Sequence, residues 1–168
     1  MDLLPLFLKL AGRRVVLVGD GPVAAGKLDA LRRAGADVRL IDPATFQPAD
    51  LDEAWLVVSA ATTEVNRRVA EAAEARRIFV NAVDDPPNAS AYLGGVVRRS
   101  GVTIAISTSG DAPALAGILR EGIDALLPPD LDRWIAAARD LRTVWKADGV
   151  PMAERRPQLI EALKALYP

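Results

Sequence analysis

The sequence predicts an α/β fold in which a parallel sheet is followed by a small hairpin and a helical tail. Short continuous apolar runs alternate with helical patterns as far as about residue 88, which is typical of parallel strands covered on both faces. Beyond that residue the pattern changes to two strand-like segments and three helical ones. The change predicts a sheet domain over 1–110, with the strands of the hairpin from about residue 90, and a helical region over 111–168.

Composition limits the classes of function. The chain has 168 residues, of which 51% are hydrophobic, and a net charge of −1, so neither nucleic acid nor a membrane is an expected partner. It contains no cysteine and no histidine, which excludes disulfides and thiolate zinc sites, and no metal site is predicted. The apolar start of the chain is short and broken by Pro5, so it does not read as a signal peptide and a cytoplasmic protein is expected.

A glycine turn follows the first apolar run, 15–18. Gly19, Gly21 and Ala24 occupy the small positions of a G-x-G-x-x-A pattern. Gly19 allows the tight turn, Gly21 lets a pyrophosphate approach the backbone, and Ala24 lets the helix pack closely on the strand. Pro22 lies near the first helical position, where a missing N–H costs little, and the anion would bind the free N–H groups there. The pattern therefore predicts a Rossmann-like dinucleotide site.

An acidic residue is also expected about 20 residues further on, and Asp42 occupies that place after the strand-like segment 38–41. Two alternatives remain open: a glycine turn that binds nothing, and Asp42, followed by Pro43, as a turn residue. Asp20 argues against a cofactor, because two unit charges ~4 Å apart at a protein surface repel by about 4 kcal/mol. We therefore expect the Asp20 carboxylate to point away from the phosphates.

The remaining elements of the sheet domain follow in order. The opening segment is expected to pack against the sheet edge, and the helix 22–34 to turn Val23, Leu28 and Leu31 inward and end at Gly35. The connection 42–54 has 13 residues, which allow one helical turn but no further strand.

A strand over 55–60, a helix over 64–76 capped by Thr62 or Thr63, and a strand over 79–83 complete the domain. The carboxyl ends of parallel strands lie at one edge of a sheet, where ligands bind. We expect four loops there: the glycine loop, the Asp42 loop, the loop 60–62 and the loop that begins at Asp84.

The segments after Asn88 have a different character. Strands are predicted over 92–98 and 102–107, and helices over 112–126, 131–147 and 153–166. Pieces of this size do not bury their apolar faces alone, so the sequence predicts a dimerisation or lid module and an obligate homodimer.

Several motifs together resemble the siroheme synthase N-terminal family over nearly the whole chain. They are 4–8, 18–27, 59–62 with Asn66, 81–85 (Asn-Ala-Val-Asp-Asp), 105–113 with 119–121, and 126–128. Members of that family are precorrin-2 dehydrogenases, and some are also sirohydrochlorin ferrochelatases. The resemblance implies an NAD-dependent oxidation of precorrin-2 to sirohydrochlorin by a homodimer, in siroheme and porphyrin biosynthesis.

The resemblance also implies roles for single residues. The family's catalytic aspartate corresponds to Asp84, and its phosphorylatable hydroxyl to Thr108. The implied cofactor-binding residues are Gly19, Gly21, Pro22, Val23, Ala24, Asp42, Pro43, Ala61 and Thr62. A tetrapyrrole with many carboxylates favours arginine partners, for which the candidates are Arg98, Arg99, Arg120, Arg155 and Arg156.

The chemistry of the residues agrees with a strand-end base. Hydride removal needs a nicotinamide at the strand ends and a base for the accompanying proton, which without histidine must be a carboxylate. Asp84 lies there, and its neighbour Asp85 can exchange roles with it. From the residues alone, a turn residue in the Asp-Asp-Pro-Pro segment 84–87 is the favoured interpretation of Asp84, and the resemblance reverses that preference.

Other functions remain open. A non-catalytic NAD-binding or sensing module of the same fold is favoured by Asp20 and by the short connection after Asp42. A nucleotide-binding regulatory domain is a third possibility, which does not need the turn 107–113. For iron insertion the chain offers only hard oxygen ligands, so a strong dedicated iron site is not expected.

Overall fold

The computed structural model describes residues 3–167, which form two units. The first unit comprises the chain up to Leu93 together with Ser107–Pro113. The second comprises Gly94–Ile106 and the chain from Ala114 onward. Residue 110, where the sequence predicts a boundary, thus lies in a segment that returns to the first unit, and the division into a sheet domain and a helical region stays a prediction.

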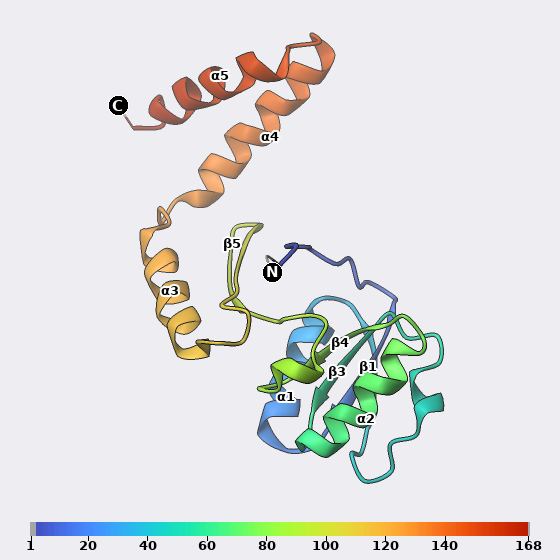
Figure 1. Ribbon diagram of the computed structural model, residues 1–168. Helices are drawn as coiled ribbons and strands as arrows, with labels where there is room; N and C mark the ends of the chain where they lie inside the picture. Colours follow the sequence, from blue (N-terminus) through green and yellow to red (C-terminus); the bar gives the residue numbers. More distant parts are fainter. Residues whose placement is uncertain (1–2, 168) are drawn as a thin grey trace. The chain divides into compact units, whose positions relative to one another are not determined.

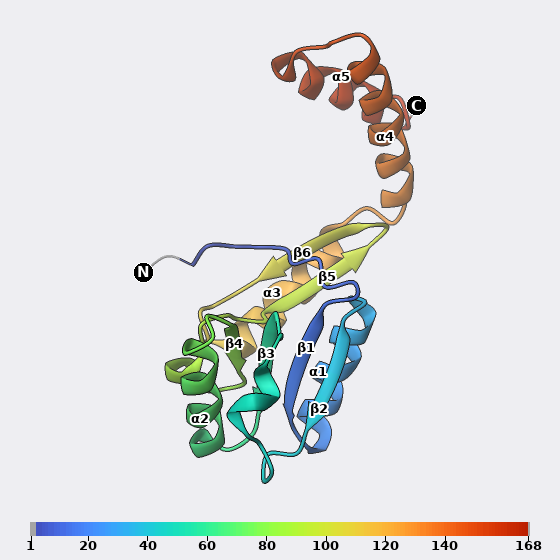
Figure 2. The same ribbon diagram turned by 90° about the vertical axis from the view of Figure 1, so that its right-hand side faces the viewer.

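The first unit is built on a four-stranded parallel sheet with the order β2-β1-β3-β4. Figure 1 labels β1, β3 and β4, and Figure 2 labels all four strands. Its strands are β1 (Arg14–Gly19), β2 (Asp37–Ile41), β3 (Leu56–Ala60) and β4 (Phe79–Ala82). The central strand β1 is paired on both sides and its residues Val15–Val18 have no exposed surface. Continuous apolar runs are therefore what a sheet buried on both faces requires.

Two helices cover opposite faces of the sheet, as Figure 2 shows. One is α1 (Gly21–Arg33), whose Leu31 belongs to the apolar cluster on one face, and the other is α2 (Thr63–Glu74), whose Val69 belongs to the cluster on the other. On the outer face of α2, Arg67 donates hydrogen bonds to Glu64 and Glu71, which raise the pKa of its guanidinium.

The inner face of α1 differs from the predicted one at a single position. Val23 is 54% exposed, whereas Ala24 and Leu31 are buried and Leu28 is partly buried. Ala24, Leu28 and Leu31 are spaced by four and three residues and share one face, and Val23 lies about 100° away around the helix. The expectation that Val23 faces inward is therefore wrong.

The end of α1 is as predicted. Gly35 has φ +77°, and its N–H and that of Ala36 donate to the carbonyls of Arg32 and Leu31. This is the Schellman arrangement, in which a left-handed residue closes a helix and glycine is preferred.

The connection after β2 contains one 3₁₀ turn, η1 (Pro48–Leu51), and no further strand, so β2 is an edge strand. Phe46 and Leu51 are buried beneath α2. The opening segment does not pack as expected: Leu10 is buried, but Leu4 is 79% and Phe7 69% exposed.

The second unit holds an antiparallel hairpin and three helices. They are β5 (Gly95–Arg99), β6 (Val102–Ile106), α3 (Pro113–Leu126), α4 (Leu131–Ala147) and α5 (Met152–Lys164). A Cβ at Gly95 would lie 3.1 Å from the carbonyl oxygen of Ala116, so this glycine lets α3 approach β5 closely. Trp145 donates to Gln158 at 2.6 Å, which links α4 to α5. No helix in the described part of the chain is long and apolar enough to cross a membrane.

Candidate functional site

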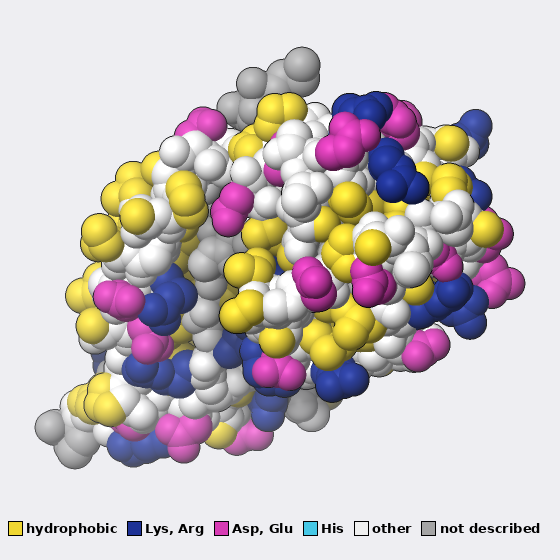
Figure 3. Space-filling model, turned by 90° about the horizontal axis from the view of Figure 1, so that it is seen from below, with side chains coloured by type: hydrophobic (Ala, Val, Ile, Leu, Met, Phe, Trp, Pro, Cys, Tyr) yellow, Lys and Arg dark blue, Asp and Glu magenta, His cyan; other side chains and the backbone are white. Residues whose placement is uncertain are grey.

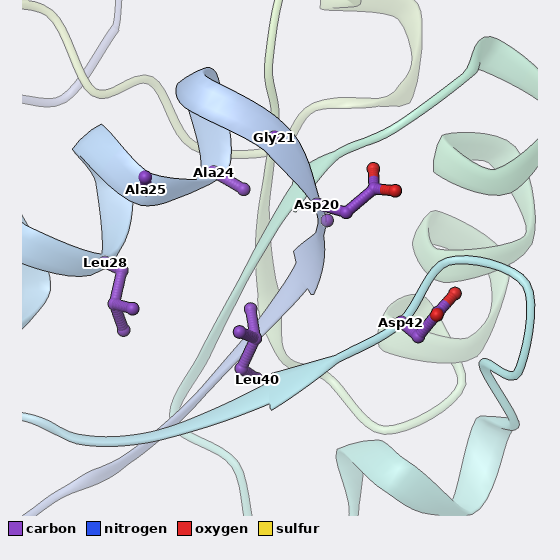
Figure 4. A pocket seen from close by; sticks show the side chains of 8 residues that line it. Asp20, Gly21, Ala24, Ala25, Leu28, Leu40 and Asp42 are labelled. Atoms are coloured by element: carbon purple, nitrogen blue, oxygen red, sulfur yellow. The ribbon is translucent and has the colours of Figure 1, made fainter.

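A pocket of about 480 Å³ opens at the carboxyl ends of β1 and β2 (Figure 4). Four of the residues predicted to bind a cofactor line it together: Gly19, Gly21, Ala24 and Asp42. The remaining lining residues are Asp20, Ala25, Leu28 and Leu40. The first unit thus brings the glycine turn and the acidic strand end to one cavity.

The two glycines of the turn have different physical roles. A Cβ on Gly19 would lie 2.9 Å from the carbonyl oxygen of Ala60 and 3.0 Å from the Ala24 side chain, so Gly19 keeps β1, β3 and α1 close together. A Cβ on Gly21 would meet nothing within 4 Å, and its φ is +79°. Gly21 therefore leaves open space beside the backbone, as an approaching phosphate requires.

The start of α1 offers backbone donors to an anion. Asp20 is the N-cap residue, but its side chain makes no capping hydrogen bond. In Figure 4 the carboxylates of Asp20 and Asp42 both point away from α1. The N–H groups of the first helical turn thus remain available to a pyrophosphate, although the Asp20 charge lies near them.

Asp42 shows features of both interpretations offered by the sequence. Its Oδ1 accepts the N–H of Ala44 at 2.8 Å, which makes it a turn residue. In the described part of the chain, no group donates to its Oδ2. The second oxygen is free to accept from a ribose hydroxyl while the first one holds the turn.

Five of the predicted cofactor residues do not line the pocket: Pro22, Val23, Pro43, Ala61 and Thr62. Pro22 and Val23 open α1, and Pro43 follows Asp42. Ala61 and Thr62 form the loop after β3, where Thr62 caps α2 by accepting the N–H of Val65 at 3.5 Å. Their roles toward a cofactor stay predictions.

Ala25, Leu28 and Leu40 line the pocket but are absent from the prediction. Leu40 is 53% exposed because β2 is the edge strand. Alternation along β2 places Leu40 on the face opposite to buried Ile41, and this alternation was the one signal in the sequence that pointed to it.

Asp84 lies in the loop directly after β4. It is exposed, and its φ of +54° is a left-handed conformation that non-glycine residues seldom adopt. No group among residues 3–167 donates a hydrogen bond to its carboxylate. The side chain is therefore free to accept a proton from a ligand at the strand ends.

Asp85 is different, because it is 8% exposed and held by two amides. Asn66 of α2 donates to its Oδ2 at 3.1 Å, and Asn88 donates to both of its oxygens at 3.0 Å. Ser59 of β3 in turn donates to Oδ1 of Asn66 at 2.7 Å. The two neighbouring carboxylates thus have unlike surroundings, which adjacency in sequence did not reveal.

The turn Ser107–Gly110 lies against the same loop. A Cβ at Gly110, whose φ is +85°, would come within 2.8 Å of Pro86 in η2 (Pro86–Asn88). Thr108 accepts the N–H of Ala112 through its hydroxyl at 3.3 Å, next to the start of α3. The turn therefore brings a serine- and threonine-bearing segment beside the loop of Asp84.

Three of the candidate arginines have partners within the second unit. Arg99 pairs with Asp124 at 2.8 Å, Arg120 pairs with Glu121 at 2.9 Å, and Arg155 donates to the carbonyl of Val150 at 2.9 Å. Among the described residues no cluster of three or more acidic side chains is arranged to hold a metal ion.

Comparison with known proteins identifies the family of the sheet unit. Residues 6–95, more than half of the chain, match the model of a family described as putative NAD(P)-binding. The chain belongs to this family. The pocket fits such a cofactor, because it combines open space at Gly21, free N–H groups at α1 and an acceptor at Asp42.

The similarity to curated proteins extends beyond that segment. Siroheme synthase 1 of Yersinia enterocolitica is 41% identical and siroheme synthase 1 of Aeromonas salmonicida 40% identical, each over 93% of this chain. The chain spans only 37% and 38% of the lengths of these two relatives. The predicted resemblance to siroheme synthases is confirmed.

A solved structure shows the same fold. The protein titled SirC, precorrin-2 dehydrogenase, matches with a TM-score of 0.71 over 95% of this chain and 88% of that one, at 20% sequence identity. The predicted α/β fold, with a parallel sheet, a hairpin and a helical tail, is confirmed.

Proposed function

We propose that this chain catalyses the NAD-dependent dehydrogenation of precorrin-2 to sirohydrochlorin, a step of siroheme biosynthesis. The observation that supports it best is the extent of the similarity to siroheme synthases. It covers 93% of the chain, whereas the NAD(P)-binding match ends at residue 95. A relationship through nucleotide binding alone would not include the hairpin and the three helices.

The residues of the first unit suit this reaction. NAD, when bound, would supply the hydride acceptor, and the residues of this chain have to bind the dinucleotide and remove a proton from the substrate. The glycine loop and Asp42 would hold the cofactor, and Asp84 is an exposed carboxylate directly after β4 to which no group in the described part of the chain donates. We assign Asp84 the role of the base and leave Asp85, which is buried and hydrogen-bonded, without that role.

The test is NADH formation, followed at 340 nm, with precorrin-2 and NAD as substrates. Asp84→Asn keeps the shape and removes the base, so turnover should fall by at least about tenfold while NAD still binds. Glu64→Gln is the matched control, because it also converts an exposed carboxylate into a carboxamide, here on α2. It should leave turnover unchanged. Unchanged turnover in Asp84→Asn would show that the assignment is wrong.

A second function is supported by one observation, the carboxylate of Asp20 at the N-cap of α1. A negative charge at this position weakens pyrophosphate binding. A module that senses NAD without turnover would tolerate this weaker binding. The same assay separates the two functions: a sensing module binds NAD and produces no NADH.

We further propose that the chain acts as a homodimer through its second unit. The helix α3 exposes Leu115, Ile118, Leu119 and Leu126, of which Leu126 is 84% exposed. Apolar side chains at this spacing form one face, and a second copy of the chain would cover it. A cytoplasmic location and weak ferrochelatase activity stay predictions from the sequence.

A further inference from the structure

The hydrogen bonds around Asp85 join two loops of the proposed catalytic site. Ser59 is the fourth residue of β3 and Asn66 lies in the first turn of α2, so these two residues flank the loop of Ala61 and Thr62. Asp85 follows Asp84 in the loop after β4. We propose that the chain Ser59–Asn66–Asp85 positions Asp84, and that Asp85 is a positioning residue and not the base; this rests on the proposed function.

These hydrogen bonds are costly to break because the groups that form them are buried. Ser59 has no exposed surface, Asn66 is 1% exposed and Asp85 is 8% exposed. Away from water, a donor that loses its partner is costly, so the bonds persist only in one arrangement. Asp85 accepts and does not donate as a carboxylate, which makes Asn66 turn its NH₂ group toward Asp85 and its oxygen toward the hydroxyl of Ser59.

The loop after β4 needs the support of these hydrogen bonds. Asp84 has a left-handed φ of +54°, and a non-glycine residue keeps that conformation only where its surroundings enforce it. Asp85 is the next residue, and its carboxylate is held by Asn66 from α2 and by Asn88 from within the loop. Anchoring Asp85 therefore fixes the backbone from which the Asp84 side chain projects.

An exchange of side chains tests the proposal. Asn66→Asp places a second carboxylate against Asp85, where 3.1 Å now separates donor and acceptor. Asp85→Asn replaces one of the two acceptor oxygens by an NH₂ group, which then faces the NH₂ group of Asn66 or of Asn88. The double variant Asn66→Asp with Asp85→Asn reverses the direction of one bond but keeps the three positions joined. The new amide at position 85 would donate to the new carboxylate at position 66, and Ser59 would still donate to that carboxylate. Each single variant should lower kcat by at least about tenfold, and the double variant should recover to within about threefold of wild type.

Hydrogen–deuterium exchange of residues 83–88 supplies a readout that does not depend on turnover. The single variants should exchange faster in this segment, while β1 stays protected, and the double variant should return to the wild-type rate. Ser59→Ala, a milder change in case the others fail to fold, should also speed exchange there. Ser90→Ala is the control, because it removes a serine hydroxyl that accepts from Val80 outside this chain of bonds, and exchange over 83–88 should not change.

The outcomes separate this proposal from the proposed function. If wild-type protein makes no NADH, the dehydrogenase assignment fails, and the exchange rates alone decide whether the bonds hold the loop. If the double variant regains protection but not kcat, Asp85 itself is needed for the chemistry and the proposal is overturned. Exchange over 83–88 that is unchanged in Ser59→Ala and Asp85→Asn overturns it as well. In an Asp84→Asn background the loss due to Asp85→Asn should disappear, whereas two independent losses would multiply.

Discussion

The two units bury their own apolar side chains to very different degrees. In the first, the strands Val15–Val18 and Leu56–Val58 are 0–2% exposed, and clusters lie on both faces of the sheet. In the described part of the second, the buried apolar residues are Val97, Ala116, Leu131 and Trp145. The difference indicates that the first unit has an interior of its own, and it supports the proposal that a second copy of the chain covers the helices of the second unit.

The largest effect is expected in the interior of the first unit. Leu17→Ala removes a side chain without exposed surface from the central strand, so the free energy of unfolding should fall by about 2–5 kcal/mol. Chemical denaturation measures it. Leu4→Ala, at a residue that is 79% exposed in the same unit, is the control and should change the stability by less than about 0.5 kcal/mol. Similar losses for both would show that burial in the central strand does not carry the stability of the first unit.

The sheet was predictable from the sequence because its signals are local. The apolar run Val15–Val18, the glycine after α1 and the length of the connection 42–54 each determine one feature by themselves. The structure differs where contacts decide the outcome. The opening segment is apolar, and nothing in its pattern indicates that Leu10 is buried while Leu4 and Phe7 are exposed.

The candidate site was predictable only in part for the same reason. A glycine pattern and an acid at the right spacing indicated the pocket. The unlike surroundings of Asp84 and Asp85 depend on Asn66, which comes from another element 19 residues earlier. No periodicity in the sequence reports such a contact, since it arises from the packing of α2 beside the end of β4.

The second effect tests the incomplete interior of the second unit. Ile118→Arg places a charge on the exposed face of α3, so the dissociation constant of the proposed dimer should rise by about tenfold or more. Light scattering across a concentration series measures it. Leu4→Arg makes the same kind of change on an exposed residue of the first unit and should leave association unchanged. A wild-type chain that is monomeric at micromolar concentration would contradict the dimer itself.

The third effect tests whether the first unit carries the nucleotide site alone. The free oxygen of Asp42 can accept from a ribose hydroxyl but repels a 2′-phosphate, so NAD should bind about tenfold more tightly than NADP. Asp42→Asn should reduce that ratio. Asp37→Asn alters an acid at the opposite end of the same strand and should not. The ratio of NADP to NAD dissociation constants should be the same in Ile118→Arg, because that substitution lies in the second unit. Tighter binding of NADP than of NAD by the wild type would refute the role of Asp42.

The smallest effect concerns Asp20. Its carboxylate lies at the N-cap of α1 beside the N–H groups that would receive a pyrophosphate, yet Figure 4 shows it turned away from the helix. Figure 3 shows acidic and basic side chains interspersed over the face it draws. Exposed charges are screened by salt, and the net charge of the chain is only −1, so no broad field reinforces the charge of Asp20. Asp20→Asn should therefore tighten NAD binding by only about three- to fivefold at low salt, and less at high salt. Asp29→Asn, at an exposed acid further along α1, is the control and should have no such effect. Weaker binding in Asp20→Asn would mean that the carboxylate itself holds the cofactor, and the acid in the glycine loop would then be part of the nucleotide site and not a disturbance of it.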